Sequence, residues 1–309
     1  MKAGVIGVGK LGKIHARIYG ELDEFELVGV SDPIRPDDEH LHGARWTDDY
    51  RELLTMGIQA VSIATPTVNH HEVAKFFLEN GVHCLIEKPI AVSMAEASDL
   101  LEVAARNQAF LMVGMVERFN KAYGEARKMI TGPMFIESHR LGPFPNRSLD
   151  ISVVLDLMIH DLDIILDLVD DEVASVEGVG IKALTDKADI ANARIHFQGG
   201  CIANVTASRI SEEKMRRTRV FFNHNYVSLD FAGHKIKAFR NTQSGIEKRE
   251  IDIEMEEPLK REILHFHTGI TAEPRDYTMA KNAAMALDLA LKIDEDLTNR
   301  QNQLRSAPN

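Results

Sequence analysis

Cysteine, long apolar runs and targeting signals are all scarce in this sequence. Only Cys84 and Cys201 occur among 309 residues, too few for a disulfide framework or a cysteine-rich zinc site. No run of about 18 uncharged apolar residues is present, which predicts that no helix spans a membrane. The first residues lack the long apolar segment and cleavage site of a signal peptide. Together these absences predict a cytoplasmic protein.

Positive charge is scarce as well. Lysine and arginine number 36 against 47 aspartates and glutamates, which gives a formal net charge of −11. An acidic chain is poorly suited to nucleic acid or to an anionic membrane, so we expect neither as a partner. The basic run over residues 214–219 is the exception. Its lack of interleaved aromatic residues argues against nucleic acid. Its arginines could suit a diphosphate, but we interpret the run as a charged edge strand.

The first third of the sequence alternates apolar runs with helical periodicity. Periodicity predicts helices over residues 10–22 and 70–79, and Ser93 with Glu96 forms a capping box for a third helix. Strands are expected over residues 3–6, 25–30, 60–64, 82–86 and 110–116. Strands separated by helices predict βαβ units, and hence a doubly wound parallel sheet of the Rossmann type in an α/β protein.

The rest of the chain has a different pattern. A long apolar helix is expected over residues 151–169, and short alternating segments with turn signals between residues 173 and 254 indicate a mostly antiparallel sheet. Two closing helices are expected over residues 258–268 and 275–293. We therefore predict two α/β domains, formed by residues 1–120 and 121–309.

A glycine-rich pattern, G-x-G-x-x-G, occupies residues 7–12. It follows a predicted strand and opens a predicted helix, as a dinucleotide-binding loop must. Gly7 would allow the tight turn, Gly9 the approach of a pyrophosphate, and Gly12 close packing of helix on strand. Backbone N–H groups at the start of the helix would bind the anion, including those of Lys10 and Leu11.

Asp32 lies about 20 residues beyond the last glycine, at the end of the second predicted strand. A carboxylate there can accept hydrogen bonds from the ribose hydroxyls of NAD and repels the 2′-phosphate of NADP. Arg35 is close in the sequence and could hold that phosphate, so NADP remains an alternative. The sequence predicts NAD as the preferred cofactor.

Lys88 follows the fourth predicted strand and precedes Pro89. Ligands of doubly wound sheets bind outside the carboxyl ends of the strands, and the proline restricts the backbone of Lys88 to an extended conformation. A fixed ammonium group there could stabilise a developing alkoxide or polarise a carbonyl. A surface lysine at a strand end is the alternative interpretation.

Polar residues interrupt the expected helix over residues 151–169 at regular intervals. Asp156, His160, Asp163 and Asp167 are spaced i, i+4, i+7 and i+11, which places them within one narrow arc of an α-helix. Burying carboxylates beside a histidine is costly unless they are paired or meet a polar ligand, so this stripe is a candidate acid–base site. A satisfied core histidine is the alternative.

A metal site is a further alternative for the same helix. His160 and Asp163 could ligate a metal together with His139. No second recognisable ligand pair accompanies them, so we expect no metal.

These motifs together resemble the glucose–fructose oxidoreductase and inositol dehydrogenase family, Gfo/Idh/MocA, over most of the chain. Met158 replaces the glycine that the family usually has two residues after the first aspartate of a D-x-x-x-H-x-x-D helix. The substrate therefore cannot be copied from the glucose or inositol enzymes. The residues that carry the resemblance are the glycine loop with His15, Asp32-Pro33, Thr65-Pro66-Thr67 with His70, Glu87-Lys88-Pro89, Arg118-Phe119, and Asp156 with His160 and Asp163.

The resemblance implies an NAD(P)-dependent sugar dehydrogenase with a Rossmann domain and an α/β domain. The second domain would have an open, mostly antiparallel sheet through which family members often form dimers or tetramers. His160 would take the hydroxyl proton and Lys88 would steady the oxygen, with Asp156 in the same pocket, although the sequence leaves open which of the two is the base. Further cofactor contacts are expected at Thr65, Pro66, His70, Glu87 and Lys88, and substrate contacts at Arg118, Arg140, Asp163 and Arg209.

A narrower resemblance concerns residues 139–144 and the helix that follows. It is to the branch of the family that oxidises the 3-hydroxyl of UDP-N-acetylglucosamine to a 3-keto nucleotide sugar. Arg140, Arg147 and Arg209 stand out in an acidic chain, and guanidinium groups suit a diphosphate. A dehydrogenase of a free sugar or inositol is the alternative function, and a non-catalytic NAD(P)-binding regulator is a further one.

Overall fold

The computed structural model describes residues 1–145 and 151–306. Contacts between Cα atoms divide the chain into two compact units. The first unit contains residues 1–116 and 257–284, and the second contains residues 117–256 and the chain from Met285 onward. The segment 257–284 therefore packs with the first unit, whereas the predicted boundary near residue 120 assigned it to the second domain.

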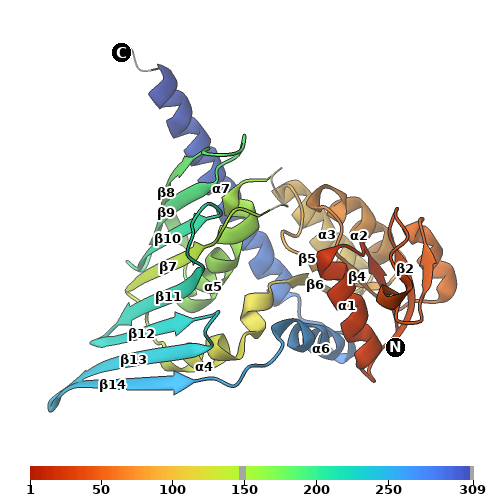
Figure 1. Cartoon of the computed structure of the whole chain (residues 1–309), viewed down its shortest axis with the longest axis horizontal. Helices are drawn as coiled ribbons and strands as arrows, with labels where there is room; N and C mark the ends of the chain where they lie inside the picture. Colours follow the sequence, from red (N-terminus) through yellow and green to blue (C-terminus); the bar gives the residue numbers. More distant parts are fainter. Residues whose placement is uncertain (146–150, 307–309) are drawn as a thin grey trace. The chain divides into compact units, whose positions relative to one another are not determined.

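A six-stranded parallel sheet forms the centre of the first unit, in the order β3-β2-β1-β4-β5-β6 (Figure 1). This is the strand order of a Rossmann sheet, and it confirms the predicted doubly wound fold. Every strand except the three-residue β3 was predicted from the sequence. The strands are β1 (Lys2–Ile6), β2 (Glu26–Ser31), β3 (Arg45–Thr47), β4 (Ala60–Ile63), β5 (His83–Glu87) and β6 (Leu111–Gly114).

Helices connect these strands, and local signals determine where they begin. The hydroxyl of Ser93 accepts a hydrogen bond from the backbone N–H of Glu96 at 3.3 Å, as the predicted capping box requires. The main helices of this unit are α1 (Lys10–Glu21), α2 (His70–Glu79), α3 (Met94–Arg106) and α6 (Pro258–Thr271). Short 3-10 turns are η1 (Asp38–His40), η2 (Tyr50–Met56) and η3 (Thr67–Asn69), while η4 (Val116–Phe119) lies at the junction of the units.

The order of the strands locates the ligand-binding edge of this sheet. β1 lies between β2 and β4, so the chain winds outward in opposite directions on its two sides. Parallel register pairs Ile6 with Ile63 and with Ser31, which brings the carboxyl ends of the three strands to one edge. Ligands of doubly wound sheets bind at this switch point.

The second unit is built on an eight-stranded sheet in the order β14-β13-β12-β11-β7-β10-β9-β8 (Figure 1). Only β7 and β10 pair in parallel, so the predicted mostly antiparallel sheet is confirmed. The prediction did not include β7, β8 or β14. The interpretation of residues 214–219 as an edge strand is wrong, because β11 lies inside the sheet and pairs with both β12 and β7. The strands are β7 (Phe135–Leu141), β8 (Val173–Ile181), β9 (Ile190–Phe197), β10 (Ile202–Ser208), β11 (Met215–Phe222), β12 (Asn225–Asp230), β13 (Lys235–Thr242) and β14 (Gly245–Asp252).

Helices cover one face of this sheet and form its hydrophobic core. Residues of β9 alternate between buried and more exposed positions, because only one face of the strand meets the helices. Gly178 and Gly180 on β8 let Leu297 approach closely, while Val179 and Ile181 are 54% and 55% exposed. The helices are α4 (Lys121–Met129), the π-helical turn η5 (Val154–Met158), α5 (Ile159–Val169) and the part of α7 (Thr278–Ser306) from Met285 onward.

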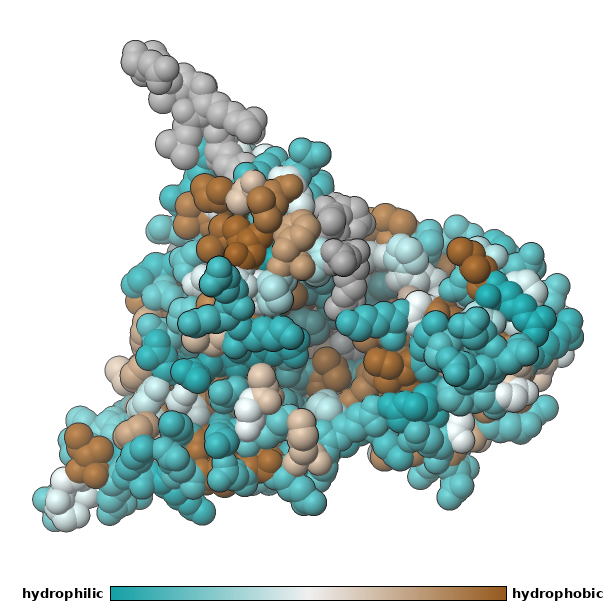
Figure 2. All heavy atoms as spheres, viewed as in Figure 1, coloured by the Kyte–Doolittle hydropathy of each residue, from teal (hydrophilic) through white to brown (hydrophobic). Residues whose placement is uncertain are grey.

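The face of the molecule shown in Figure 2 is largely hydrophilic, with apolar residues in small groups. Among the described residues, Val179 and Ile181 on β8 and Leu184 after it have largely exposed side chains. In the described part of the chain, no helix combines the length and the apolar character needed to cross a membrane.

Candidate active site

The glycine loop between β1 and α1 has the geometry that its sequence predicts. Gly7 has φ +81°, a left-handed conformation in which a side chain would be strained. A Cβ atom at Gly12 would lie 1.7 Å from the carbonyl oxygen of Gly7, so the helix can approach the strand only without a side chain there. A Cβ at Gly9 would have no described neighbour within 4 Å, which leaves that backbone accessible to a ligand.

The start of α1 suits an anion. Gly9 is its N-cap residue, and neither a side-chain cap nor an acidic residue satisfies the first turn among the described residues. The first N–H groups of a helix, here including those of Lys10 and Leu11, have no partner within the helix and carry a partial positive charge. A pyrophosphate at this position would supply the missing acceptors.

Asp32 lines a cavity of about 650 Å³ beside this loop, which also contains Gly7, Thr65 and Pro66. Its Oδ2 accepts the backbone N–H of Val8 at 2.7 Å, and its Oδ1 accepts that of Ile34 at 2.9 Å. Both oxygens retain lone pairs that can accept hydrogen bonds from hydroxyl groups of a ligand. The carboxylate is therefore fixed in position before a ligand binds.

Acidic residues dominate the same cavity. Asp48, Asp49 and Glu72 join Asp32 in its wall, whereas Arg51 is the one cation among its lining residues. Arg51 is already paired with Glu72 at 3.0 Å and with Asp49 at 3.4 Å. This excess of negative charge disfavours the 2′-phosphate of NADP.

One arginine was expected at this cavity, and a different one lines it. Arg35, which could have held a 2′-phosphate, pairs instead with Asp38 at 2.8 Å and is not among the residues that line the cavity. Arg51 and its acidic neighbours were missed in the sequence. Their signal is weak because they follow β3, a strand of only three residues.

His70 is buried and joins two corners of the first unit. Its Nδ1 lies 2.8 Å from the carbonyl oxygen of Pro89, and its Nε2 lies 2.9 Å from that of Thr65. Burial lowers the pKa of His70 despite these two carbonyl groups. His70 thus connects the loop after β4 to the loop after β5, and its role at a cofactor site remains a prediction.

The segment Glu87-Lys88-Pro89 ends β5. The side chain of Glu87 is buried, and its Oε2 accepts the backbone N–H of Lys88 at 3.3 Å. Lys88 itself is half-buried, and the peptide bond to Pro89 is cis. Lys88 therefore lies at the ligand-binding edge of the first-unit sheet.

Asp156 and His160 occupy consecutive turns of the second unit, but not of one α-helix. The prediction of a single α-helix over residues 151–169 is wrong at its start, where η5 is a π-helical turn. The wider turn displaces Asp156 from the arc calculated for a regular helix. Asp156 is buried and His160 is half-buried. Such π-helical turns inside helices are frequent at functional sites.

Arg118 and Asp163, both predicted substrate ligands, bind each other within the second unit. Arg118 donates from Nε to Asp163 Oδ2 at 2.6 Å and from Nη2 to Asp163 Oδ1 at 2.8 Å. A third contact joins Arg118 to Asp167 at 2.6 Å. Burial opposes the charge of Arg118, but the two carboxylates raise its pKa above the ordinary value.

Arg140 and Arg209 are also held by internal carboxylates. Arg140 is 3% exposed and binds Asp161 at 2.6 Å and Glu117 at 2.8 Å. Arg209 is 1% exposed and binds Asp189 at 2.9 Å. These contacts give both guanidinium groups structural partners, and their contact with a substrate remains a prediction. Arg147 lies outside the described residues.

The metal alternative receives no geometric support. Among the described residues, His139, His160 and Asp163 are not brought together as a cluster of potential ligands. A cluster of three buried side chains that meets this criterion is formed instead by His15, Glu87 and Glu262, in the first unit.

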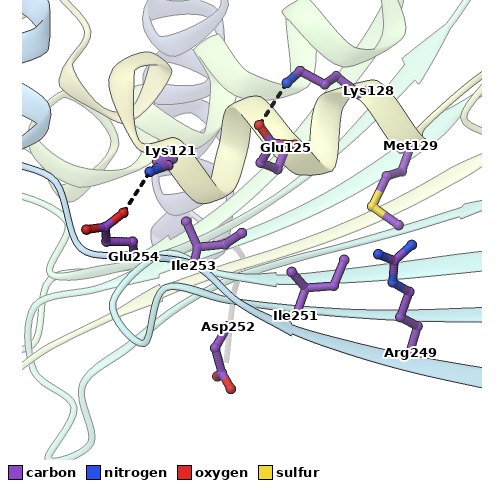
Figure 3. A pocket seen from close by; sticks show the side chains of 9 residues that line it. All are labelled: Lys121, Glu125, Lys128, Met129, Arg249, Ile251, Asp252, Ile253 and Glu254. Atoms are coloured by element: carbon purple, nitrogen blue, oxygen red, sulfur yellow. Dashed lines mark hydrogen bonds and ion pairs between the residues drawn. The ribbon is translucent and has the colours of Figure 1, made fainter.

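A second cavity, of about 410 Å³, lies between α4 and β14 in the second unit (Figure 3). It contains none of the predicted site residues. Lys121 donates to Glu254 at 3.4 Å, and Lys128 donates to Glu125 at 2.7 Å. Because these charges already neutralise each other, the cavity near Asp32 is the better candidate for a ligand.

A Rossmann sheet with this glycine loop and a carboxylate at the end of β2 is typical of a dinucleotide-binding protein. Family comparison agrees with the fold. Residues 1–115 match the model described as the oxidoreductase family with an NAD-binding Rossmann fold, and residues 134–227 match the GFO/IDH/MocA C-terminal domain. The chain belongs to the GFO/IDH/MocA family and is an NAD-dependent dehydrogenase.

Individual relatives cover most of the chain. UDP-N-acetylglucosamine 3-dehydrogenase of Acidithiobacillus ferrooxidans is 37% identical over 286 residues, which is 88% of this chain and 89% of that protein. A solved structure of that enzyme covers 96% of this chain and 97% of its own, with a TM-score of 0.89 and 36% identity. The scyllo-inositol 2-dehydrogenase (NAD(+)) of Bacillus subtilis is 30% identical over 233 residues, 68% of each protein.

Proposed function

We propose that this dehydrogenase oxidises the 3-hydroxyl of UDP-N-acetylglucosamine to a ketone. The observation that carries the proposal is the 37% identity, over 88% of the chain, to an enzyme with that activity. NAD⁺, when bound, accepts the hydride that leaves the oxidised carbon. The acidic cavity around Asp32 supports NAD rather than NADP as the partner in this reaction.

The catalytic groups in this proposal are Lys88, His160 and Asp156. His160 takes the proton of the hydroxyl group through a ring nitrogen, and the Nζ of Lys88 stabilises the oxygen as negative charge develops on it. Asp156 lines the same pocket and influences the basicity of His160. The position of Lys88 at the carboxyl end of β5 and of Asp156 on a π-helical turn supports these roles.

Inositol oxidation is the second candidate. It is favoured by the 30% identity to the scyllo-inositol enzyme over 68% of the chain. The lower identity and coverage place it behind the nucleotide sugar.

A substrate panel separates these two functions. The protein is incubated with NAD⁺ and, separately, with UDP-N-acetylglucosamine, other UDP-hexoses, free sugars and inositols, while the absorbance of NADH is followed. An aminotransferase that consumes the keto product is included to pull an unfavourable equilibrium forward. We expect NADH from UDP-N-acetylglucosamine. NADH from free inositol and none from UDP-sugars would overturn the proposal.

Lys88→Ala is the control that assigns this turnover to the proposed site. Loss of the ammonium group should lower kcat at least about 100-fold while NAD still binds, because electrostatic stabilisation of a developing oxyanion is typically of this size. Lys75→Ala is the matched variant, since Lys75 pairs with Asp99 on the neighbouring helix. It should retain turnover.

We also propose that the chain assembles into a homodimer or homotetramer through the outer face of the second-unit sheet. The exposed side chains of Val179 and Ile181 on β8, opposite the helix-covered face, support this surface. Sedimentation velocity measures the size of the assembly.

A further inference from the structure

Glu262 in the first unit is a carboxyl group that is buried without a hydrogen-bond partner among the described residues. It lies on α6 with 0% of its surface exposed. Neither of its carboxyl oxygens has a hydrogen-bond partner among the described residues. An ionised carboxylate without a partner is strongly disfavoured in a protein core, whereas the protonated acid is far less so. Burial and the neighbouring Glu87 raise the pKa of Glu262 well above its ordinary value.

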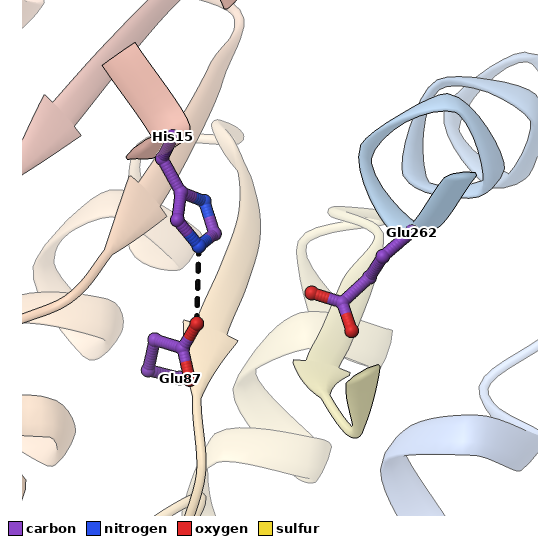
Figure 4. Close-up of side chains that lie close together, drawn as sticks. All are labelled: His15, Glu87 and Glu262. Carbon is purple, nitrogen blue, oxygen red and sulfur yellow. Dashed lines mark hydrogen bonds and ion pairs between the residues drawn. The ribbon is translucent and has the colours of Figure 1, made fainter. Parts of the chain in front are cut away.

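The Glu262 carboxyl group faces the hydrogen-bonded side chains of His15 and Glu87 (Figure 4). His15 Nε2 lies 3.0 Å from Glu87 Oε1, and ligand atoms of His15, Glu87 and Glu262 all lie within 4.8 Å of one another. The environment of Glu87 favours its charged form, because its pKa is lowered. Burial opposes its charge, but the hydrogen bond from His15 and the charge of Lys88 lower its pKa.

The hydrogen bond between His15 and Glu87 is part of a longer chain of hydrogen bonds. His15 Nδ1 lies 3.0 Å from the hydroxyl of Ser62, which in turn lies 2.8 Å from that of Tyr19. A neutral His15 satisfies the whole chain when Tyr19 donates to Ser62, Ser62 donates to His15, and His15 donates to Glu87. Every donor in this arrangement is used once.

Gly114 on β6 leaves room between the two carboxyl groups. A Cβ atom there would lie 3.4 Å from Oε1 of Glu262 and 3.4 Å from Oε1 of Glu87. The two oxygens are beyond direct hydrogen-bond distance but close enough to be bridged by one water molecule, with hydrogen bonds of about 2.8 Å. The O–H of Glu262 can thus serve as a further donor toward Glu87.

We propose that Glu262 is a protonated carboxylic acid that donates toward Glu87 and, with His15, is a positioning residue for Lys88. Its role toward Lys88 rests on the proposed dehydrogenase mechanism, whereas its protonated state does not. Glu87 immediately precedes Lys88 and accepts its backbone N–H. Fixing the carboxylate of Glu87 therefore fixes the start of the Lys88 side chain.

The proposal also has a pH dependence. Loss of the Glu262 proton would place two carboxylates side by side, remove a donor from Glu87 and strengthen the negative potential at Lys88. Activity that depends on Lys88 should therefore change on the alkaline side as Glu262 ionises. The titratable groups that interact with this cluster are His15 and Tyr19 on α1, His70 on α2, Cys84, Glu87 and Lys88 on and after β5, and Glu262 itself.

Isotope-edited infrared spectroscopy tests the protonation without requiring turnover. Protein labelled with ¹³C-glutamate should show the C=O band of a protonated carboxyl group at neutral pH, and Glu262→Gln should lose it. Glu257→Gln is the matched control, because Glu257 lies exposed before the same helix and pairs with Arg17. It should keep the band. Absence of the band from the wild-type protein would overturn the proposal.

Metal analysis tests the alternative that His15, Glu87 and Glu262 bind a divalent cation, in which case Glu262 would not be protonated. One histidine and two carboxylates can ligate a divalent cation. The proposal expects no stoichiometric metal in protein dialysed against zinc. Zinc bound one to one and lost in Glu262→Gln would overturn it.

The positioning of Lys88 is tested by its own titration. Lysines are reductively methylated with ¹³C and the Lys88 resonance is assigned with Lys88→Arg. Glu262→Leu, which removes the donor, should shift the Lys88 titration, whereas Glu262→Gln, which keeps a donor but cannot ionise, should behave like the wild type near neutral pH and lack only the alkaline change. If Glu262→Leu does not fold, Glu262→Gln should still lack the alkaline change of the wild-type Lys88 resonance. Identical titrations in the variants and the wild type would overturn the positioning role.

Turnover then separates this role from a merely structural one. In active enzyme, Glu262→Leu should lower kcat about 10–100-fold with little change in KM for NAD, since a slightly misplaced catalytic group costs this much. Glu262→Gln should restore kcat. A protein that oxidises no nucleotide sugar but keeps the infrared band and the Lys88 shift would refute the proposed function and leave the network intact.

Discussion

At the scale of single residues, Asp32 is organised by the backbone before any ligand binds. Two N–H groups, from Val8 and Ile34, hold its carboxylate oxygens. Because the Asp32 carboxylate is already held in one orientation, binding a ligand costs little side-chain entropy, which favours affinity. The same fixed charge, surrounded by further carboxylates, opposes a 2′-phosphate.

Asp32→Ala should reduce the preference for NAD over NADP. Removing hydrogen bonds to a charged acceptor costs about 1.5–3 kcal/mol, so NAD affinity should fall about 10- to 100-fold while NADP affinity falls less. Calorimetric titration with both nucleotides measures the ratio. Asp23→Ala, at an exposed position, is the control. An unchanged ratio in Asp32→Ala would contradict the role assigned to this carboxylate.

The sequence was informative about residues whose role is local. The glycine loop and Asp32 could be predicted because turn geometry and strand ends leave a signature within about 30 residues. The internal partners of Arg140 and Arg209 could not be predicted. Asp161 and Asp189 are about 20 residues away, and only the fold brings them to the guanidinium groups.

At the scale of elements, strands with alternating or continuous apolar residues were predicted, and the others were missed. β14 carries charged residues along most of its length and is largely exposed, so it has no hydrophobic pattern. β8 contains Gly178 and Gly180, which weaken a strand pattern but are required where Leu297 packs closely. The π-helical turn at η5 was missed because its residues also fit an α-helix.

Arg209 connects several elements of the second unit. It follows β10 and binds Asp189, which precedes β9, and it donates to the carbonyl oxygen of Ile151 at 3.0 Å. Burial alone would raise the pKa of Asp189, but N–H donors from Leu184 and Thr185 and the pairing with Arg209 lower it well below its ordinary value. The pair therefore anchors the loop between β8 and β9.

Arg209→Met should lower the free energy of unfolding by about 3–5 kcal/mol, because it leaves the charge of Asp189 buried without its cation. Urea denaturation measures this change. Arg217→Met is the control, since Arg217 forms an exposed pair with Asp230 and should cost less than about 1 kcal/mol. A small loss of stability combined with a large rise in substrate KM would instead make Arg209 a substrate ligand.

At the scale of the whole molecule, the chain returns to its first unit near its end. Residues 257–284 pack there and bring Glu262 beside Glu87, about 175 residues earlier in the chain. No periodicity or composition change in the sequence marks this return, because α6 reads as an ordinary amphipathic helix. The cytoplasmic location and the assembly through the second-unit sheet remain predictions at this scale.

The proposed mechanism requires that Lys88 and His160 act on the same hydroxyl group. The most direct measurement is a crystal structure of the complex with NADH and UDP-N-acetylglucosamine. We predict that Lys88 Nζ and a ring nitrogen of His160 both lie within hydrogen-bond distance, about 2.6–3.2 Å, of the 3-hydroxyl oxygen. Side chains directed into separate cavities, with only one of them near that oxygen, would contradict the account.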